Sequence, residues 1–286
     1  MRPGHLSFEF FPPKTEEGKK SLLAAQRVLA AFSPDFFSIT CGAGGSSRSR
    51  TQETVQFLAQ QGAKISPHVT GMGAGPKDIE ALILNYLDAG IRKMVLLRGD
   101  PPLEDAPSRR PSCAFAFASD LVRFSRALIP EEVEIFVAAY PEVHPEAISS
   151  KEDLLHLKEK LEAGANAAIT QYFFNPDAYV YFREACLHAG ISAPIIPGVM
   201  PITDFAGLRR FSARCGAEIP RWLAMRLQDL QETPEAMEDF GADVVARLCE
   251  KLLASGAPGL HFYTLNRAAA TERILLRLGI APGGAA

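Results

Sequence analysis

A glutamate within an apolar, strand-like segment is the first residue of the chain that could do chemistry. Side chains alternate across a strand, so one face of Leu6–Phe11 carries Ser7, Glu9 and Phe11. Aromatic surroundings disfavour a charged carboxylate, so we expect a raised pKa for Glu9, which suits a general acid. The structural alternative is a glutamate paired with an arginine inside the protein, because an unpaired buried charge is costly.

Two glycine-containing loops follow other strand-like segments. Arg98-Gly99-Asp100 places a carboxylate just past one strand end, where the glycine lets a ligand approach the backbone. An Asp-Pro turn with a surface ion pair is the alternative. The second loop, residues 40–48, has glycines and serines that could hold an anion, but it lacks the G-K-[ST] element of a P-loop. We therefore expect residues 40–48 to form a plain flexible loop and not an anion site.

Histidines are few, and their spacing does not favour a metal site. His68 and His144 each adjoin a proline near an expected strand end, and the chain has neither an H-x-H nor an H-E-x-x-H pattern. We therefore expect neutral, hydrogen-bonding histidines. Asp153, His156 and Lys160 share one face of an expected helix, and such a face is usually solvated.

Gln171 and Arg267 are the remaining candidates that the residue types suggest. An amide among aromatic side chains, as at Gln171, can recognise a heteroaromatic ring, or it can cap a strand end. Arg267 follows a strand-like segment and could meet an anionic substrate tail, although a surface ion pair is its commoner role. The candidate residues include two acids, an amide and several aromatic residues, but few cations. This set suits a large, flat heteroaromatic ligand better than a sugar phosphate.

The elements that must position these residues alternate in type along the chain. The expected strands are Leu6–Phe11, Phe36–Thr40, Ile65–Thr70, Met94–Gly99, Ile135–Tyr140, Ala168–Phe173, Pro194–Met200 and Leu260–Leu265. The expected helices are Glu16–Ala31, Gln52–Gln61, Asp78–Ala89, Ser119–Leu128, Glu152–Ala163, Asp177–His188, Phe205–Cys215, Pro234–Leu253 with Thr233 as its cap, and Ala268–Leu278. This alternation predicts an α/β fold, the (β/α)8 TIM barrel, whose active site lies at the C-terminal ends of the strands. A doubly wound sheet is the competing fold, but no G-x-G-x-x-G follows the first strand.

The composition excludes several other classes of protein. The chain has 286 residues, a formal net charge of −3 and 47% hydrophobic residues, which is typical of a globular protein. It has no basic stripe for nucleic acid, no apolar stretch of membrane-spanning length and no signal-peptide pattern. Five cysteines without a C-x-x-C pair argue against a zinc ribbon or a disulfide framework. We expect one cytoplasmic domain over residues 1–286, with no nucleic-acid or membrane partner.

Four motifs stand out by their length and their order along the chain. They are SFEFFPPK at residues 7–14, RGD at 98–100, AAYPEVHPE at 138–146 and HFYTLNR at 261–267. Together they resemble the methylenetetrahydrofolate reductase family, from the first expected strand to the last. The length is similar to that of the single-domain bacterial members. The fold that the resemblance implies is a (β/α)8 barrel, in agreement with the strand count.

The resemblance implies a flavoprotein of one-carbon metabolism that reduces 5,10-methylenetetrahydrofolate to 5-methyltetrahydrofolate. In such a ping-pong reaction NAD(P)H reduces bound FAD and leaves, and the folate then accepts hydride. Glu9 matches the family's general acid, which drives opening of the folate's imidazolidine ring, and Asp100 matches a carboxylate near the flavin. The residues that match FAD contacts are Thr40, Cys41, His68, Arg98, Gly99, Asp100, Ala118, Tyr140, His144, Asp153, His156 and Lys160. The residues that match substrate contacts are Glu9, Asp100, Gln171, Phe211, Tyr263 and Arg267.

Three positions depart from the pattern of the family. Cys41 stands where Tyr is frequent, so a backbone contact to FAD would survive there and a side-chain stack would not. His156 stands where Asn is frequent. Gly207 stands where some members have a folate-contacting Gln, and that contact is not carried over.

Two other functions remain as alternatives at this point. One is a metal-dependent barrel hydrolase that uses His68, His144 and Asp100, and the other is a folate- or flavin-binding protein without turnover. No ribose-recognising fingerprint distinguishes NADH from NADPH as the reductant. The resemblance also implies a homo-oligomer.

Overall fold

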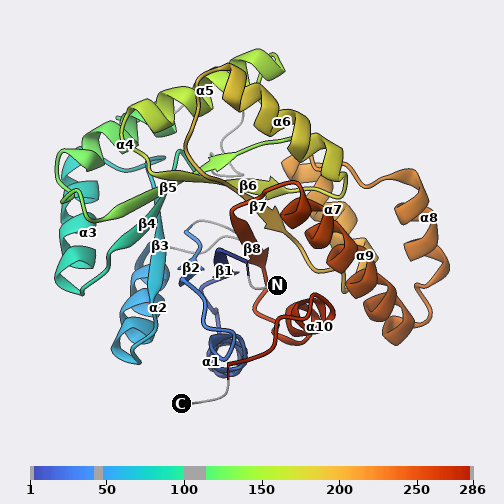
Figure 1. Ribbon diagram of the computed structural model, residues 1–286. Helices are drawn as coiled ribbons and strands as arrows, with labels where there is room; N and C mark the ends of the chain where they lie inside the picture. Colours follow the sequence, from blue (N-terminus) through green and yellow to red (C-terminus); the bar gives the residue numbers. More distant parts are fainter. Residues whose placement is uncertain (1–2, 42–47, 100–113, 284–286) are drawn as a thin grey trace.

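The computed structural model describes residues 3–41, 48–99 and 114–283 of the chain. Within these ranges, parallel strands close into a barrel in sequence order, with β1 paired to both β2 and β8 (Figure 1). The strands are β1 (His5–Phe10), β2 (Phe36–Ile39), β3 (Ile65–Thr70), β4 (Lys93–Leu97), β5 (Glu134–Ala139), β6 (Ala167–Tyr172), β7 (Ile195–Val199) and β8 (Gly259–Tyr263). The expected (β/α)8 TIM barrel is confirmed.

Helices surround the strands (Figure 1). They are α1 (Glu16–Ala30), α2 (Arg48–Gln60), α3 (Pro76–Asp88), α4 (Ala118–Arg126), α5 (Ser150–Glu162), α6 (Pro176–His188), α7 (Phe205–Cys215), α8 (Arg221–Asp229), α9 (Pro234–Ala254) and α10 (Ala269–Arg277). The expected boundaries lie within a few residues of these. In the part of the chain that the structure describes, no helix is both long and apolar enough to cross a membrane.

The helix α8 has no counterpart in the sequence prediction. Its buried residues are Leu223 and Leu227, whereas Trp222 is exposed on the same short helix. Two buried positions one turn apart give too little periodicity to identify a helix from the sequence. The next helix, α9, begins after Thr233 as expected, although no side-chain hydrogen bond of Thr233 caps it.

β1 shows how the alternating pattern sorts the side chains. Phe8 and Phe10 are fully buried in the core between the strands and the helices. Ser7 and Glu9 point into the barrel, where both contact His261 of β8. A separate apolar cluster fills much of the remaining interior, and its buried members are Phe36, Val95, Phe136, Ala167, Ile169 and Ile196. The expectation that Ser7 and Glu9 share one face of this strand is therefore confirmed.

The closure of the barrel brings the first and last strands together. β8 pairs with β1 so that Gly259 lies beside His5, and His261 lies beside Ser7. A Cβ atom on Gly259 would collide with the backbone carbonyl of His5, so only glycine permits this close approach. The inward side chains of β1 consequently occupy successive levels of the interior, from His5 at the N-terminal end of the strand to Glu9 near the mouth.

Candidate active site

Glu9 lies inside the barrel near the C-terminal end of β1, and its side chain is 11% exposed. Its Oε2 atom is 3.2 Å from Nε2 of His68 on β3 and 3.5 Å from Nε2 of His261 on β8. The hydroxyl of Ser38 on β2 donates a long hydrogen bond of 3.5 Å to the same oxygen. Side chains from β2, β3 and β8 thus surround the carboxylate of β1. They lie at the C-terminal end of the strands, where the active sites of (β/α)8 barrel enzymes are found.

The pKa of Glu9 is lowered, so the expectation of a raised value is wrong. Burial by itself raises this pKa, but the charge of His68 and the hydrogen bonds from His261 and His68 outweigh burial and bring the pKa of Glu9 to about 2. The sequence prediction weighed the apolar neighbours within β1. It did not include the two histidines that distant strands bring to the carboxylate, and the partner is not the arginine that we considered as the structural alternative.

Behind Glu9, a row of hydrogen-bonded side chains continues down the interior of the barrel. The Ser7 hydroxyl is 2.7 Å from Nδ1 of His261 and 2.8 Å from Nε2 of His5. Nδ1 of His5 lies 3.3 Å from Oδ2 of Asp35. No role was predicted for His5, Asp35 or the side chain of His261. The alternation that placed Ser7 beside Glu9 would have found His5, if it had been extended backward along β1.

Arg98 and His144 lie in loops at the mouth, after β4 and β5. The guanidinium of Arg98 donates to both carboxylate oxygens of Glu146, at 2.8 and 3.0 Å. The backbone N–H of His144 donates to Asp153 at 3.0 Å. Burial is the main reason that the pKa of His144 is lowered, and its Nδ1 accepts a hydrogen bond from the backbone of Glu146. The expectation of a neutral, hydrogen-bonding histidine is confirmed for His144.

The helix face with His156 and Lys160 packs against the barrel and is not simply solvated, as the residues alone suggested. His156 stacks on Phe117, with ring centroids 5.0 Å apart and planes 24° apart, and Ala118 begins α4 next to this pair. Lys160 is buried, and its Nζ donates a hydrogen bond of 2.5 Å to the carbonyl of Ala138 on β5. Burial lowers the pKa of Lys160 to about 8.

The ends of β2, β3 and β4 lie next to one another at the mouth. Thr40 is buried, and its hydroxyl makes no hydrogen bond within the described ranges of the chain. Cys41 follows it and accepts a long hydrogen bond from Thr70. Gly99 has a φ of +86°, and a Cβ atom there would lie 3.1 Å from Cβ of Thr70, so a side chain would be both strained and crowded. Asp100 lies outside the described residues.

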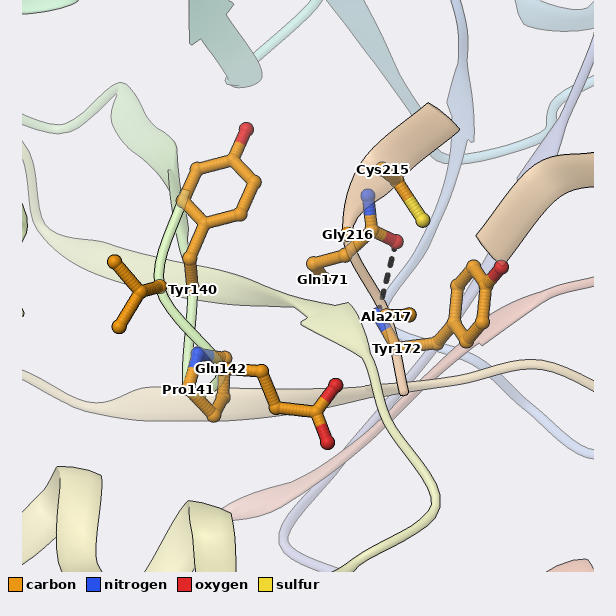
Figure 2. Close-up of a pocket in the computed structure, with 9 residues that line it drawn as sticks. Tyr140, Pro141, Glu142, Gln171, Tyr172, Cys215, Gly216 and Ala217 are labelled. Carbon is orange, nitrogen blue, oxygen red and sulfur yellow. Dashed lines mark hydrogen bonds between the residues drawn. The ribbon is translucent and has the colours of Figure 1, made fainter. Parts of the chain in front are cut away.

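Gln171 of β6 lines a small pocket at the mouth (Figure 2). Its Oε1 accepts a hydrogen bond of 2.9 Å from the backbone N–H of Tyr172, so it caps a backbone group at the strand end and also borders the pocket. Burial raises the pKa of Glu142, a second acid in the same pocket. The lining residues are Tyr140, Pro141, Glu142, Val143, Gln171, Tyr172, Cys215, Gly216 and Ala217.

The other predicted substrate residues differ in exposure. The hydroxyl of Tyr263 on β8 donates a hydrogen bond of 2.6 Å to the carbonyl of Thr170. Burial raises the pKa of Tyr263 well above its ordinary value, so the phenol stays protonated. Phe211 on α7 is 42% exposed, and Arg267 after β8 is also exposed. Tyr263 therefore belongs to the barrel interior, whereas Phe211 and Arg267 are presented to solvent.

Asn266 was not predicted as a functional residue, although it belongs to the motif HFYTLNR at residues 261–267. Its side chain accepts from the backbone N–H of Phe11 at 2.7 Å and donates to the carbonyl of Phe11 at 2.8 Å. Leu265 and Asn266 both have positive φ values, 53° and 59°, in the turn after β8. Asn tolerates this backbone region better than most residues, which is the signal that could have identified it.

The polar groups of the described chain suit proton handling rather than metal binding. No group of three or more His, Cys, Asp or Glu side chains in residues 3–41, 48–99 and 114–283 could hold a metal ion. Of the residues that a barrel hydrolase would use, His68 pairs with Glu9 and His144 is held by a separate loop, while Asp100 is not described. The central carboxylate with its two imidazoles can hold a proton and pass it to a bound molecule.

Comparison with known proteins identifies relatives over nearly the whole chain. The family model described as methylenetetrahydrofolate reductase matches residues 3–279. The 5,10-methylenetetrahydrofolate reductase of Escherichia coli is 39% identical over 281 residues, which are 98% of this chain and 92% of that protein. The protein of the same name from Pectobacterium carotovorum is 37% identical and covers 97% of this chain and 91% of its own length. A rice protein described as a probable methylenetetrahydrofolate reductase (NADH) is 36% identical over 96% of this chain but only 48% of its own.

A solved structure supports the fold independently. A protein from Clostridium thermocellum, described as binding two copies of 5-methyl-5,6,7,8-tetrahydrofolic acid, matches with a TM-score of 0.64 over 98% of this chain and 95% of its own. Its sequence identity is 17%, so this likeness concerns the barrel alone. The family model and the bacterial relatives carry the assignment: the chain belongs to the methylenetetrahydrofolate reductase family.

Proposed function

We propose that this protein reduces 5,10-methylenetetrahydrofolate to 5-methyltetrahydrofolate with NAD(P)H as reductant and FAD as cofactor. The observation that carries the proposal is the Glu9 carboxylate, held between two histidines at the mouth of a barrel that belongs to this family. Reduction of this folate opens its five-membered ring, and the ring nitrogen that leaves needs a proton. Glu9 is placed to give that proton to a molecule bound at the mouth.

The residues at the mouth fit a flavin dinucleotide by their chemistry. The buried Thr40 hydroxyl has no partner among the described residues, and Gly99 keeps the backbone open to close approach. Lys160 is a buried cation whose Nζ donates to the neutral carbonyl of Ala138, so an anionic phosphate would be a better partner for it. The FAD-binding residues that we propose are Thr40, Cys41, His68, Arg98, Gly99, Asp100, Ala118, Tyr140, His144, Asp153, His156 and Lys160.

FAD would supply hydride transfer in two half-reactions, accepting hydride from the nicotinamide and giving it to the folate. The protein's own contribution is to bind and orient both substrates and to manage the proton. Gln171 can present its amide to the ring edges of the folate or the nicotinamide, and the exposed Phe211 can stack on a ring. Arg267 is available for the anionic tail of the folate.

The state of Glu9 sets a condition on this function. In the ligand-free protein the lowered pKa keeps Glu9 ionised at neutral pH. A proton must therefore reach the carboxylate in every turnover before Glu9 can act as an acid. The two histidines that lie 3.2 and 3.5 Å from its Oε2 atom are the immediate sources available in the site.

An anaerobic visible spectrum of the purified protein tests the proposal. We expect a flavin band that bleaches on addition of NADH or NADPH and returns on addition of methylenetetrahydrofolate. In Glu9→Gln the band should still bleach with NAD(P)H but should not return with the folate. Glu250→Gln, an exposed substitution on α9, serves as the matched control and should behave as the wild type. A protein that neither contains nor takes up FAD would contradict the proposal.

A further inference from the structure

The helix α7 is strongly cationic, although the net charge of the whole chain is −3. It contains Arg209, Arg210 and Arg214, all exposed, and no acidic residue. Opposite charges one turn apart stabilise exposed helices, as Arg247 and Asp243 do on α9. On α7, by contrast, Arg210 and Arg214 make no hydrogen bond or ion pair with any residue in the described ranges of the chain. Their positive charge is therefore available to a ligand.

Helical spacing places these two arginines on the same side of α7 as Phe211. Four residues follow one another along this side at positions i, i+3, i+4 and i+7: Gly207, Arg210, Phe211 and Arg214. We call these four residues the cationic face of α7. The ring of Phe211 is 42% exposed, so one side chain of this face can stack on a ring while its neighbours meet an anion. Such a face suits a ligand that joins an aromatic ring to negatively charged groups.

The absence of a side chain at Gly207 lets Arg210 lie close to the helix. A Cβ atom on this glycine would be 3.7 Å from Nη2 of Arg210, so the guanidinium lies over the glycine, one turn back along α7. Asp204 is near the same glycine but does not pair with the guanidinium. Its carboxylate instead accepts hydrogen bonds from the backbone N–H groups of Ala206 and Gly207 and caps the helix. The Arg210 guanidinium thus keeps all its donors for another partner.

Contacts on the buried side of α7 fix the helix next to the pocket that contains Gln171. The hydroxyl of Ser212 lies 3.0 Å from the hydroxyl of Tyr172, and both groups are buried, so α7 cannot rotate freely about its axis. Cys215 at the end of α7 lines the same pocket as Gln171 (Figure 2). Phe211 lies one turn before Cys215 on α7. The cationic face therefore borders the part of the mouth in which Gln171 meets a substrate under the proposed function.

We propose that Arg210 and Arg214 form, beside Phe211, a subsite that binds the anionic groups of a substrate. The inference rests on the proposed function and deepens it, because both substrates of that function join a ring to anions. The nicotinamide nucleotide carries phosphates, and the folate carries the carboxylates of its glutamate tail. A guanidinium group binds either anion with two parallel hydrogen bonds. Since Arg267 is already available for the folate tail, we expect the nucleotide to depend more on this subsite.

Stopped-flow measurements of the two half-reactions distinguish the two sources of the anion. One arm varies NADH or NADPH while the flavin is reduced, and the other varies methylenetetrahydrofolate while the flavin is reoxidised. Arg210→Gln and Arg214→Gln should each raise the half-saturating concentration about 3- to 10-fold in at least one arm, the scale of a partly exposed ionic contact. The limiting rates should change by less than about twofold, because the lost contact stabilises the ground state and the transition state equally.

The pattern of these changes identifies the anion. A rise with both nucleotides assigns the shared phosphates, and a larger rise with NADPH than with NADH assigns the 2′-phosphate. A rise confined to the folate arm assigns the carboxylates of the glutamate tail. Half-saturating concentrations that stay at the wild-type values in both arms would overturn the subsite.

Arg209 provides a matched control on the same helix. Successive residues are about 100° apart around a helix, so Arg209 lies on the side of α7 away from Phe211, with its guanidinium 5.8 Å from the ring centroid of Phe205. Arg209→Gln removes the same charge and should leave both arms unchanged. Arg210→Lys keeps the charge without the planar fork and should recover part of the loss. Equal effects of the glutamine substitutions at all three arginines would mean that only the general charge of α7 matters, which would refute the subsite.

Equilibrium binding gives a readout that does not need turnover. NAD+, NADP+ and 5-methyltetrahydrofolate are titrated by calorimetry into the FAD-loaded wild type and into a variant with both Arg210→Gln and Arg214→Gln. The wild type should bind its anionic ligand less tightly as the salt concentration rises, and the double variant should bind it more weakly with a smaller salt dependence. Unchanged affinities in the double variant would overturn the subsite and leave the proposed function intact. A wild type that binds these ligands but does not reduce the folate would contradict the proposed function, whereas weaker binding in the double variant would still support the subsite.

Discussion

The ionised state of Glu9 makes a quantitative prediction about acid stability. Its pKa is about 2 in the folded protein and 4.5 when unperturbed, a difference of about 2.5 units. At about 1.4 kcal/mol per unit, this difference contributes about 3 kcal/mol to the free energy of unfolding at pH 7. Because the folded pKa is the lower one, the contribution is complete above pH 4.5 and disappears as the pH falls through the folded value. Linkage predicts that about 2 kcal/mol of it is lost between pH 7 and pH 3.

Urea unfolding of the wild type and Glu9→Gln at a series of pH values isolates this contribution. The glutamine cannot ionise, so the difference in unfolding free energy between the two proteins should shrink by about 2 kcal/mol from pH 7 to pH 3. Other carboxylates titrate in both proteins and cancel in the difference. Glu250→Gln, whose glutamate is exposed on α9, should show a difference that does not depend on pH.

The same experiment separates the causes of the lowered pKa. His68 is the largest favourable influence on the Glu9 carboxylate, so in His68→Gln burial should dominate and the pKa of Glu9 should rise. The pH dependence described above should then weaken or reverse. A constant difference between wild type and Glu9→Gln down to pH 3 would refute the reasoning, because it would mean that folding does not shift this pKa.

Three further substitutions test other parts of the site. Gly198→Ala should lower the unfolding free energy by about 1–3 kcal/mol, because the new Cβ would lie 2.1 Å from the backbone carbonyl oxygen of Thr170 and 2.6 Å from the ring of Tyr263. An unchanged urea midpoint would contradict this. Asn266→Ala removes two hydrogen bonds to the backbone of Phe11 and should lower the unfolding free energy by about 2 kcal/mol in urea unfolding. A decrease below roughly 0.5 kcal/mol would mean that these two hydrogen bonds contribute little to stability. Lys160→Met should weaken FAD binding in a titration. Because burial lowers the pKa of Lys160, the substitution should also raise the unfolding free energy of the flavin-free protein at pH 7, and this increase should vanish as the pH rises from about 8 to 10.5. An unchanged unfolding free energy at pH 7 would show that the buried cation does not destabilise the protein.

The barrel could be predicted from the sequence because its signal repeats along the chain. Apolar runs alternate with amphipathic stretches, and several strand ends carry or precede polar or glycine residues, so the fold and the mouth-facing candidates follow from local pattern. α8 could not be predicted in this way, because only Leu223 and Leu227 of that helix are buried. The placement of Glu9 inside the barrel and of Gln171 near a strand end could be predicted because a single segment contains the information.

The electrostatics of the site depend on partners that are distant in sequence. The pKa of Glu9 was predicted in the wrong direction because His68 and His261 reach it from other strands. Local reasoning also described Lys160 as part of a solvated face, whereas the helix buries it against β5. A sequence pattern states what a residue is and which face it occupies. It does not state which side chain of another strand lies opposite.

The junction of β8 with β1 has a consequence for how this protein is made. Ser7 meets His261 across 254 residues of chain, and Phe11 meets Asn266 across 255. At a synthesis rate of about 5–20 residues per second, the amino-terminal strand waits on the order of tens of seconds on the ribosome before its last neighbour emerges. During that time Glu9 lacks one of its two histidines, and one edge of β1 has no strand beside it. A nascent chain that stops short of β8 therefore leaves an open strand edge, which makes such fragments natural clients for chaperones and proteases.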